Sequence, residues 1–95
     1  MGKLDKLARV AAQYYKVPFK KLKSPCREAV CTKPRHNCQW IAKDAGYKQS
    51  VIARYWGLDG SSISYGVKIV SNRIKSDKNE KEELKGFLRF LRVHL

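Results

Sequence analysis

Few residues in this sequence break or cross-link a chain: its 95 residues include 6 glycines, 3 prolines and 3 cysteines. This composition excludes a collagen-like or low-complexity chain, and the odd number of cysteines argues against a disulfide framework. No apolar run approaches the roughly 20 residues that a membrane-spanning helix needs, and the charged N-terminal residues do not form a signal peptide. We therefore expect a single globular domain, residues 1–95, in the cytoplasm with reduced thiols and without a membrane partner.

Acidic residues are also scarce, with 8 Asp and Glu against 21 Lys and Arg, which gives a formal net charge of +13. Residues 1–75 carry 16 basic and 4 acidic side chains, whereas residues 76–95 carry 5 and 4. A compact domain with this much charge of one sign repels itself unless an anionic partner neutralises it. Solubility does not require such one-signed clustering, so the composition favours nucleic acid as the partner.

The residue sets that catalysis needs are missing as well. Two histidines and four scattered acidic residues before residue 76 offer no nucleophile with a base and an orienting group. No Gly-rich loop ending in Lys-Ser or Lys-Thr is present to hold nucleotide phosphates. Cys26, Cys31, His36 and Cys38 offer zinc ligands, but structural zinc prefers tighter cysteine pairs, so free thiols explain them more simply. We therefore predict no enzymatic activity and no bound metal or cofactor.

Apolar residues recur at helical spacing along most of the chain, and no strand-like alternation is present. This periodicity predicts an all-α fold of four to six helices. Residues 23–33 lack an apolar period and are predicted to form a basic loop. The expected helical segments are residues 4–17, a short turn at 19–22, Pro34 to about Gly46, residues 51–56 after a Ser50 cap and before Gly57, a helix from Ile63 onward, and a last helix after the capping box of Asp77–Glu80.

Between residues 50 and 75, a short helix, a glycine-bearing turn and a longer helix with a polar start are expected to follow one another. This order is typical of a helix-turn-helix, whose second helix places its N-terminal residues in the major groove of DNA. Gly60, Ser61 and Ser62 are small enough to allow close approach to a base or a phosphate. Arg27, in the middle of the basic loop, suits the negative potential of the minor groove.

The order of residues resembles the C-terminal DNA-binding domain (domain IV) of the bacterial replication initiator DnaA, a Trp-repressor-like helix-turn-helix. The resemblance covers roughly residues 4–92. It implies a free-standing regulator of DNA replication or transcription, because the chain has no phosphate-binding loop of the initiator's ATPase domain. The residues that carry it are Val10 to Val17, Leu22, Ser24, Arg27, Lys33-Pro34-Arg35, Ile41-Ala42, Ile52, Trp56-Gly57 and Asp59 to Ile63.

The resemblance also implies roles for individual positions. Arg27 falls where the family inserts an arginine into the minor groove, and Arg35 and His36 fall where it holds backbone phosphates. The family's major-groove signature, Arg-Asp-His-Thr-Thr, falls on Leu58-Asp59-Gly60-Ser61-Ser62. Because the arginine, the histidine and both threonine methyl groups are replaced, the resemblance implies DNA binding but not recognition of the usual initiator box.

We therefore predict that the protein binds double-stranded DNA in the bacterial nucleoid. The predicted DNA contacts fall into three groups: the minor groove, the major groove and the phosphates. Arg27 is the one residue assigned to the minor groove. Major-groove contacts are assigned to Asp59, Gly60, Ser61, Ser62 and Tyr65, and phosphate contacts to Lys20, Lys21, Lys23, Lys33, Arg35, His36, Lys43, Lys48 and Lys68.

Two other functions stay open at this point. A module for protein interaction would turn its basic face to an acidic partner, or use the nearly neutral C-terminal helix to contact a partner or a second copy. A binder of single-stranded DNA or RNA would use aromatic side chains as stacking platforms. The aromatic residues available for stacking are Tyr14, Tyr15, Trp40, Tyr55 and Trp56.

Overall fold

The computed structural model describes residues 2–24 and 27–94, and the fold within these ranges is all-helical, as the sequence predicts. Six α-helices follow one another in this part of the chain, without a strand between them. None of them has the length and apolarity that crossing a bilayer requires. Their bounds are α1 Gly2–Tyr14, α2 Phe19–Lys23, α3 Ala29–Asp44, α4 Gln49–Trp56, α5 Gly60–Ser76 and α6 Lys78–His94.

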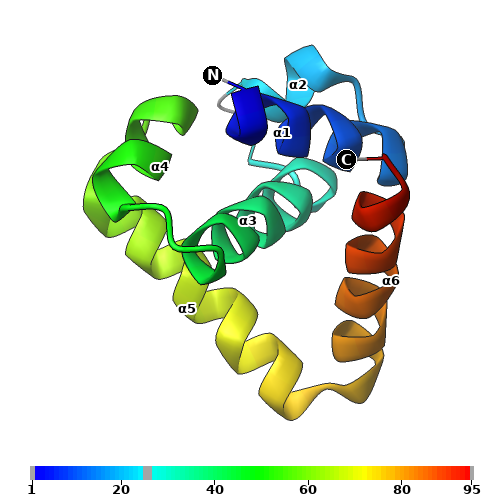
Figure 1. Ribbon diagram of the computed structural model, residues 1–95. Coiled ribbons are helices and arrows are strands. Elements are labelled where there is room, and N and C mark those ends of the chain that lie inside the picture. The colour runs from blue at the N-terminus through cyan, green and yellow to red at the C-terminus, as the bar shows by residue number, and fades with distance from the viewer. Residues whose placement is uncertain (1, 25–26, 95) are drawn as a thin grey trace.

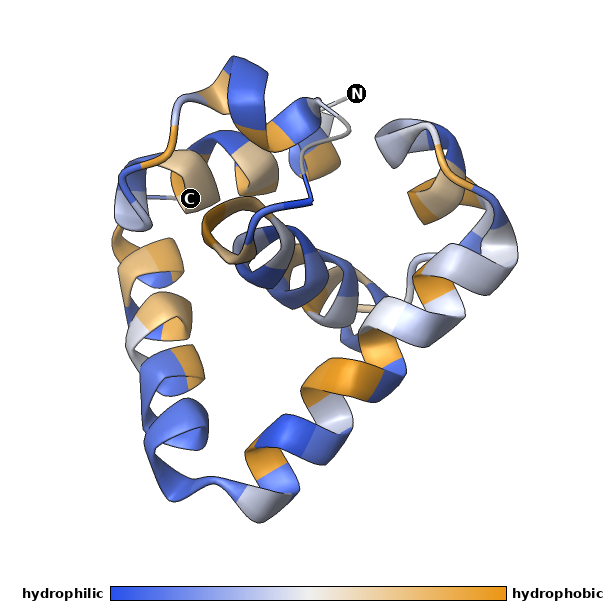
Figure 2. Ribbon diagram, turned by 180° about the vertical axis from the view of Figure 1, so that it is seen from behind, coloured by the Kyte–Doolittle hydropathy of each residue, from blue (hydrophilic) through white to orange (hydrophobic). Residues whose placement is uncertain are grey.

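Helix α3 lies at the centre of the molecule, with α1, α4, α5 and α6 around it (Figure 1). The most extensive contact between helices joins α3 to α5, and α6 packs against both α1 and α5. All six helices contribute to one buried apolar core, for example Leu22 from α2, Ile52 from α4 and Phe87 from α6. The apolar residues of α6 gather in its C-terminal half, whereas its N-terminal half is hydrophilic (Figure 2).

Helix α3 begins at Ala29, five residues before the predicted start at Pro34, so the predicted basic loop over residues 23–33 was too long. Pro34 lies inside the helix and is buried there, although it has no N–H to donate to the preceding turn. The additional turn forms because Cys31, Pro34 and Cys38 bury one stripe at helical spacing. Residues 23–33 were predicted to lack an apolar period, whereas the buried Cys31 begins this stripe.

Helix α4 begins at Gln49, and Lys48 rather than Ser50 occupies the position before it. The predicted serine cap was therefore wrong, because Ser50 lies inside the first turn. The end of α4 agrees with prediction. Gly57 adopts the left-handed conformation there (φ 68°), which a residue with a side chain rarely adopts.

Helix α1 ends at Tyr14, three residues before the predicted end at Val17. Lys16 adopts a left-handed conformation (φ 57°), which turns the chain out of the helix. The N–H of Val17 then donates to the carbonyl of Ala12 (2.9 Å), a bond that is typical of a helix end.

Helix α6 begins at Lys78 after an Asp77 cap, as the sequence predicts. The Oδ1 atom of Asp77 accepts hydrogen bonds from the backbone N–H groups of Asn79 (2.9 Å) and Glu80 (3.4 Å). The Glu80 side chain does not complete the capping box, because it pairs with Nζ of Lys33 on α3 (2.8 Å). Lys33 Nζ also lies 2.7 Å from Glu83, so ion pairs connect α6 to α3.

Candidate nucleic-acid interface

The three residues 57–59 connect α4 to α5 and set the direction in which α5 leaves α4. The backbone N–H of Leu58 donates to the carbonyl of Ala53 (2.9 Å) and closes the end of α4. From the first residue of α4, the side-chain amide of Gln49 donates to the carbonyl of Gly60 (2.6 Å). A β-carbon at Gly60 would lie 3.2 Å from that amide nitrogen, so the start of α5 packs closely on the start of α4.

Helix α5 begins at Gly60, three residues before the predicted start at Ile63, because Asp59 caps it. Asp59 Oδ1 accepts hydrogen bonds from the backbone N–H of Ser62 and from the hydroxyl of Ser61, both at 2.8 Å. These hydrogen bonds hold the pKa of the Asp59 carboxyl below its usual value, and the bond from the Ser62 N–H has the largest effect. The segment predicted to read the major groove is thus an ordered helix start with an anionic cap.

The start of α5 forms one wall of a hollow of about 380 Å³, and α3 forms the opposite wall. The Tyr65 ring (64% exposed) meets the His36 imidazole edge to face, with 6.3 Å between the ring centroids. The hollow therefore brings residues predicted to contact bases together with residues predicted to hold phosphates. Its lining residues are Arg35, His36, Gln39, Leu58, Ser61, Ser62 and Tyr65.

The close approach of α3 and α5 beside this hollow depends on Gly66. A β-carbon at Gly66 would lie 2.5 Å from Gln39 Oε1 and 2.9 Å from His36 Cδ2, so one of these side chains would have to move. Gln39 is 1% exposed, and neither polar atom of its side chain has a hydrogen-bond partner in the described part of the protein. A buried amide without a hydrogen bond costs free energy, so a group that supplies a hydrogen bond to it would be stabilised there. Sequence analysis missed Gln39, although its spacing from His36 puts both on one face of α3.

Arg35 and Lys33, both predicted phosphate contacts, are held by partners within the protein. The guanidinium of Arg35 donates to the carbonyl of Leu22 (3.2 Å) and to the carbonyl of Ser24 (2.8 Å), at the end of α2. Lys33 is held by the acidic residues of α6 described above. Arg35 thus braces α2 against α3 and also lines the hollow.

Lys23, another predicted phosphate contact, points toward α4. Its ammonium donates to the carbonyl of Tyr55 (2.7 Å) and lies 3.4 Å from the centroid of the Tyr55 ring and 5.2 Å from that of Trp56. Partial burial lowers the pKa of Lys23. A phosphate contact by Lys23 would therefore require it to leave a cation–π site that also satisfies a backbone carbonyl of α4.

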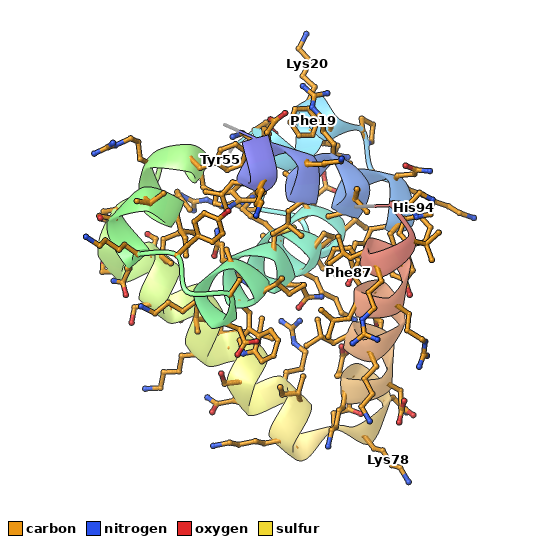
Figure 3. All side chains as sticks on the ribbon, in the orientation of Figure 1. Phe19, Lys20, Tyr55, Lys78, Phe87 and His94 are labelled. Atoms are coloured by element: carbon orange, nitrogen blue, oxygen red, sulfur yellow. The ribbon has the colours of Figure 1, made fainter. Side chains whose placement is uncertain are left out.

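The other basic residues assigned to DNA lie on the surface. Lys20 extends from α2 away from the body of the molecule (Figure 3). Lys21 lies 3.7 Å from Glu28, and both side chains are largely exposed, so this pair restrains Lys21 only weakly. Arg27 lies two residues before α3 and is not among the residues that line the hollow. The exposed basic residues among the predicted DNA contacts are Lys20, Lys21, Arg27, Lys43, Lys48 and Lys68.

The aromatic side chains that a single-strand binder would need are packed within the fold. The rings of Tyr14 and Tyr15 lie 5.3 and 5.2 Å from the buried ring of Phe87, centroid to centroid. Trp40 donates its indole N–H to a serine hydroxyl of α5 (3.2 Å). Within the described ranges, only Tyr65 is a largely exposed aromatic residue. The structure therefore favours a core role for the other aromatic residues over base stacking.

Two of the three cysteines lie in the core. Cys31 and Cys38 are buried (0% and 1% exposed), and burial raises the pKa of the Cys38 thiol. A buried thiol of this kind has little nucleophilic reactivity. Cys26 lies outside the described residues, and within them no group of three metal-binding side chains occurs.

The surroundings of His36 predict a pH-dependent stability. Burial, together with the positive charges of Arg73 and Arg35, lowers the pKa of His36. A histidine with a lower pKa in the folded state provides stability that is lost once the pH falls below its unfolded value, about 6.5. We therefore expect the free energy of unfolding to decrease as the pH falls below about 6.5, measured by urea denaturation across this range.

The matched variant for this measurement is His36→Asn, in which the decrease should be smaller. Asp5 and Asp59 also have lowered pKa values, but their contribution is lost only below the unfolded value of an aspartate, near 4. The two pH windows are therefore separate. An identical decrease in wild type and His36→Asn between about pH 6.5 and 5 would show that another group titrates there.

No protein-family model matches the chain. The candidate interface is the feature of the molecule that bears on function. Its features are a capped, polar helix start, a hollow that this helix shares with α3, and exposed basic side chains on α2, α3 and α5.

Proposed function

We propose that the protein binds double-stranded DNA, with the start of α5 in the major groove and the exposed cations on the phosphate backbones. The observation that carries the proposal is the hollow in which Ser61, Ser62 and Tyr65 of α5 lie opposite Arg35 and His36 of α3. Hydroxyl groups and an aromatic ring are suited to base edges, whereas N–H donors such as those of Arg35 and His36 are suited to phosphate oxygens. One strand of DNA can meet both kinds of group at this site.

Different residues at the start of α5 have different roles in this proposal. Asp59 fixes the turn, since its Oδ1 atom already accepts two hydrogen bonds. Ser61 and Ser62 offer hydroxyls to base edges, and Gly60 keeps the backbone close to the groove. Tyr65, one turn further on, offers an exposed ring that can pack against a thymine methyl.

The charge of the protein and its sequence resemblance support the same function. A net charge of +13 suits a polyanion, and Arg27 is exposed and free to enter a neighbouring minor groove. The resemblance to the DnaA C-terminal domain adds a regulatory role in replication or transcription in the nucleoid. Leu58, which replaces the arginine of the family signature, is 40% exposed at the edge of the hollow and would meet the DNA as an apolar group.

Fluorescence anisotropy with a labelled initiator-box duplex, a scrambled duplex and the matching single strand tests this proposal. We expect a duplex to bind more tightly than the single strand, and Tyr65→Ala or Arg27→Ala to weaken duplex binding by about 1–3 kcal/mol. Val93→Ala is the matched control, because Val93 is 80% exposed near the end of α6. Equal binding of all three ligands, with both variants like wild type, would contradict groove recognition.

A further inference from the structure

Two adjoining hollows lie where the start of α1 faces α4 and the end of α3. One, of about 500 Å³, is lined by residues of α1 and α4, and the other, of about 430 Å³, by residues of α1, α3 and α6. Lys3, Leu4 and Tyr47 line both hollows, so the two form one continuous depression. We call this depression the α1 groove.

The floor of the α1 groove is apolar. Leu4 and Leu7 of α1, Ile41 of α3, Val51 of α4 and Leu91 of α6 all line it. Leu7 and Leu91 are recessed, at 7% and 4% exposed, whereas Val51 is 39% exposed. Concave apolar sites of a few hundred Å³ are typical of places where a ligand or a peptide side chain is buried.

The rim of the α1 groove is positively charged. Lys3, Lys6 and Arg54 line it and are exposed, and no ion pair found among the described residues involves them. Among the residues that the structure describes, no acidic residue lines either hollow. Asp5, the one acidic residue of α1, accepts hydrogen bonds from Arg9 (2.8 Å) and from a tyrosine hydroxyl of α4 (2.9 Å). The positive rim therefore has no neutralising partner among the groove residues.

We propose that the α1 groove docks an acidic amphipathic helix of a partner protein. Apolar side chains on one face of that helix would fill the two hollows, and its Asp and Glu residues would pair with Lys3, Lys6 and Arg54. A DNA backbone supplies anions but has no apolar side chains for this floor. A membrane surface needs apolar side chains that protrude, whereas much of this floor is recessed.

Docking at the α1 groove would leave the proposed DNA interface free. The α1 groove shares no lining residue with the hollow at the start of α5. The α1 groove and that hollow are therefore separate sites, and the protein with both occupied would bring a partner to DNA. The groove proposal stands on its own residues and does not depend on the DNA proposal.

The test uses the full chain and a labelled helical peptide with leucines at positions i, i+3, i+4 and i+7 and glutamates between them. Fluorescence anisotropy should show saturable binding, and the amide NMR signals of Tyr47 and Val51 should shift. A peptide of the same composition in scrambled order should bind at least tenfold more weakly. Arg54→Glu and Val51→Glu should each weaken binding at least tenfold, while Lys78→Glu, exposed at the start of α6, should bind as wild type does.

A charge swap separates docking from unfolding of a variant. A peptide in which the glutamates are replaced by lysines should bind Arg54→Glu more tightly than wild type. Equal binding of ordered and scrambled peptides, or shifts outside the α1 groove, would overturn the proposal. So would self-association that Val51→Glu abolishes, or binding to vesicles with anionic lipid but not to the peptide.

Discussion

The affinity of the protein for a DNA duplex is expected to fall about 10³-fold when the salt concentration rises from 50 to 200 mM. Each cation that neutralises a phosphate releases counterions, so the logarithm of affinity falls with the logarithm of salt with a slope of about −0.9 per contact. Six residues of the predicted contact set are exposed, which predicts a slope of about −5. They are Lys20, Lys21, Arg27, Lys43, Lys48 and Lys68. Anisotropy titrations at four or more salt concentrations give the slope.

Single substitutions assign the slope to individual residues. Lys20→Gln or Lys68→Gln should make the slope less negative by about 1, whereas Lys78→Gln, on α6, should leave it unchanged. A slope near −7 would show that Lys23 and Lys33 leave their internal partners to join the phosphates. A slope near zero would contradict a binding mode in which phosphate contacts dominate.

The number of basic residues in a sequence does not reveal which of them are available to DNA. Lys23, Lys33 and Arg35 belong to the basic segment that the composition assigns to DNA, yet each contacts partners within the fold. Their partners are backbone carbonyls, aromatic rings and carboxylates far away along the chain. Lys33 and Glu83, for instance, are 50 residues apart. Only the tertiary structure brings such pairs together, so no local pattern could have predicted them.

The helices themselves were predictable where an apolar stripe and a local stop signal agree. Gly57 ends α4 and Asp77 caps α6 because both depend on contacts within a few residues. The start of α3 was not predictable in this way. A proline inside a helix and a buried cysteine, Pro34 and Cys31, are stabilised there by the core around them.

The candidate site was predictable in part for the same reason. Ser61, Ser62 and Tyr65 follow a turn signal and share a helix face, so the sequence shows them together. The position of α3 opposite them depends on Gly66, which lets the two helices approach, and nothing in the sequence marks that glycine as a contact. Gln39 was missed because its importance comes from burial without a hydrogen-bond partner.

The largest change in stability is expected for Phe87→Ala, which should lower the free energy of unfolding by about 3–5 kcal/mol. Phe87 is fully buried (0% exposed) and points from α6 into the core (Figure 3). Its ring contacts the rings of Tyr14, the last residue of α1, and of Tyr15 just after it, so truncation leaves a cavity between the first and last helices. Because domains of this size are stable by about 5–15 kcal/mol, this loss is a large fraction of the total stability. Urea denaturation followed by far-ultraviolet circular dichroism measures the difference.

Val93→Ala is the control for this substitution, since an exposed residue on the same helix should change stability by less than about 0.5 kcal/mol. The Phe87→Ala variant also separates the core from the DNA interface. Phe87 packs against α1, whereas the proposed reading segment lies at the opposite end of the fold, beside α4 (Figure 1). At a temperature where the variant is folded, its affinity for a duplex should therefore equal that of wild type. A loss of affinity in the folded variant would show that the aromatic cluster takes part in binding, as the single-strand alternative requires.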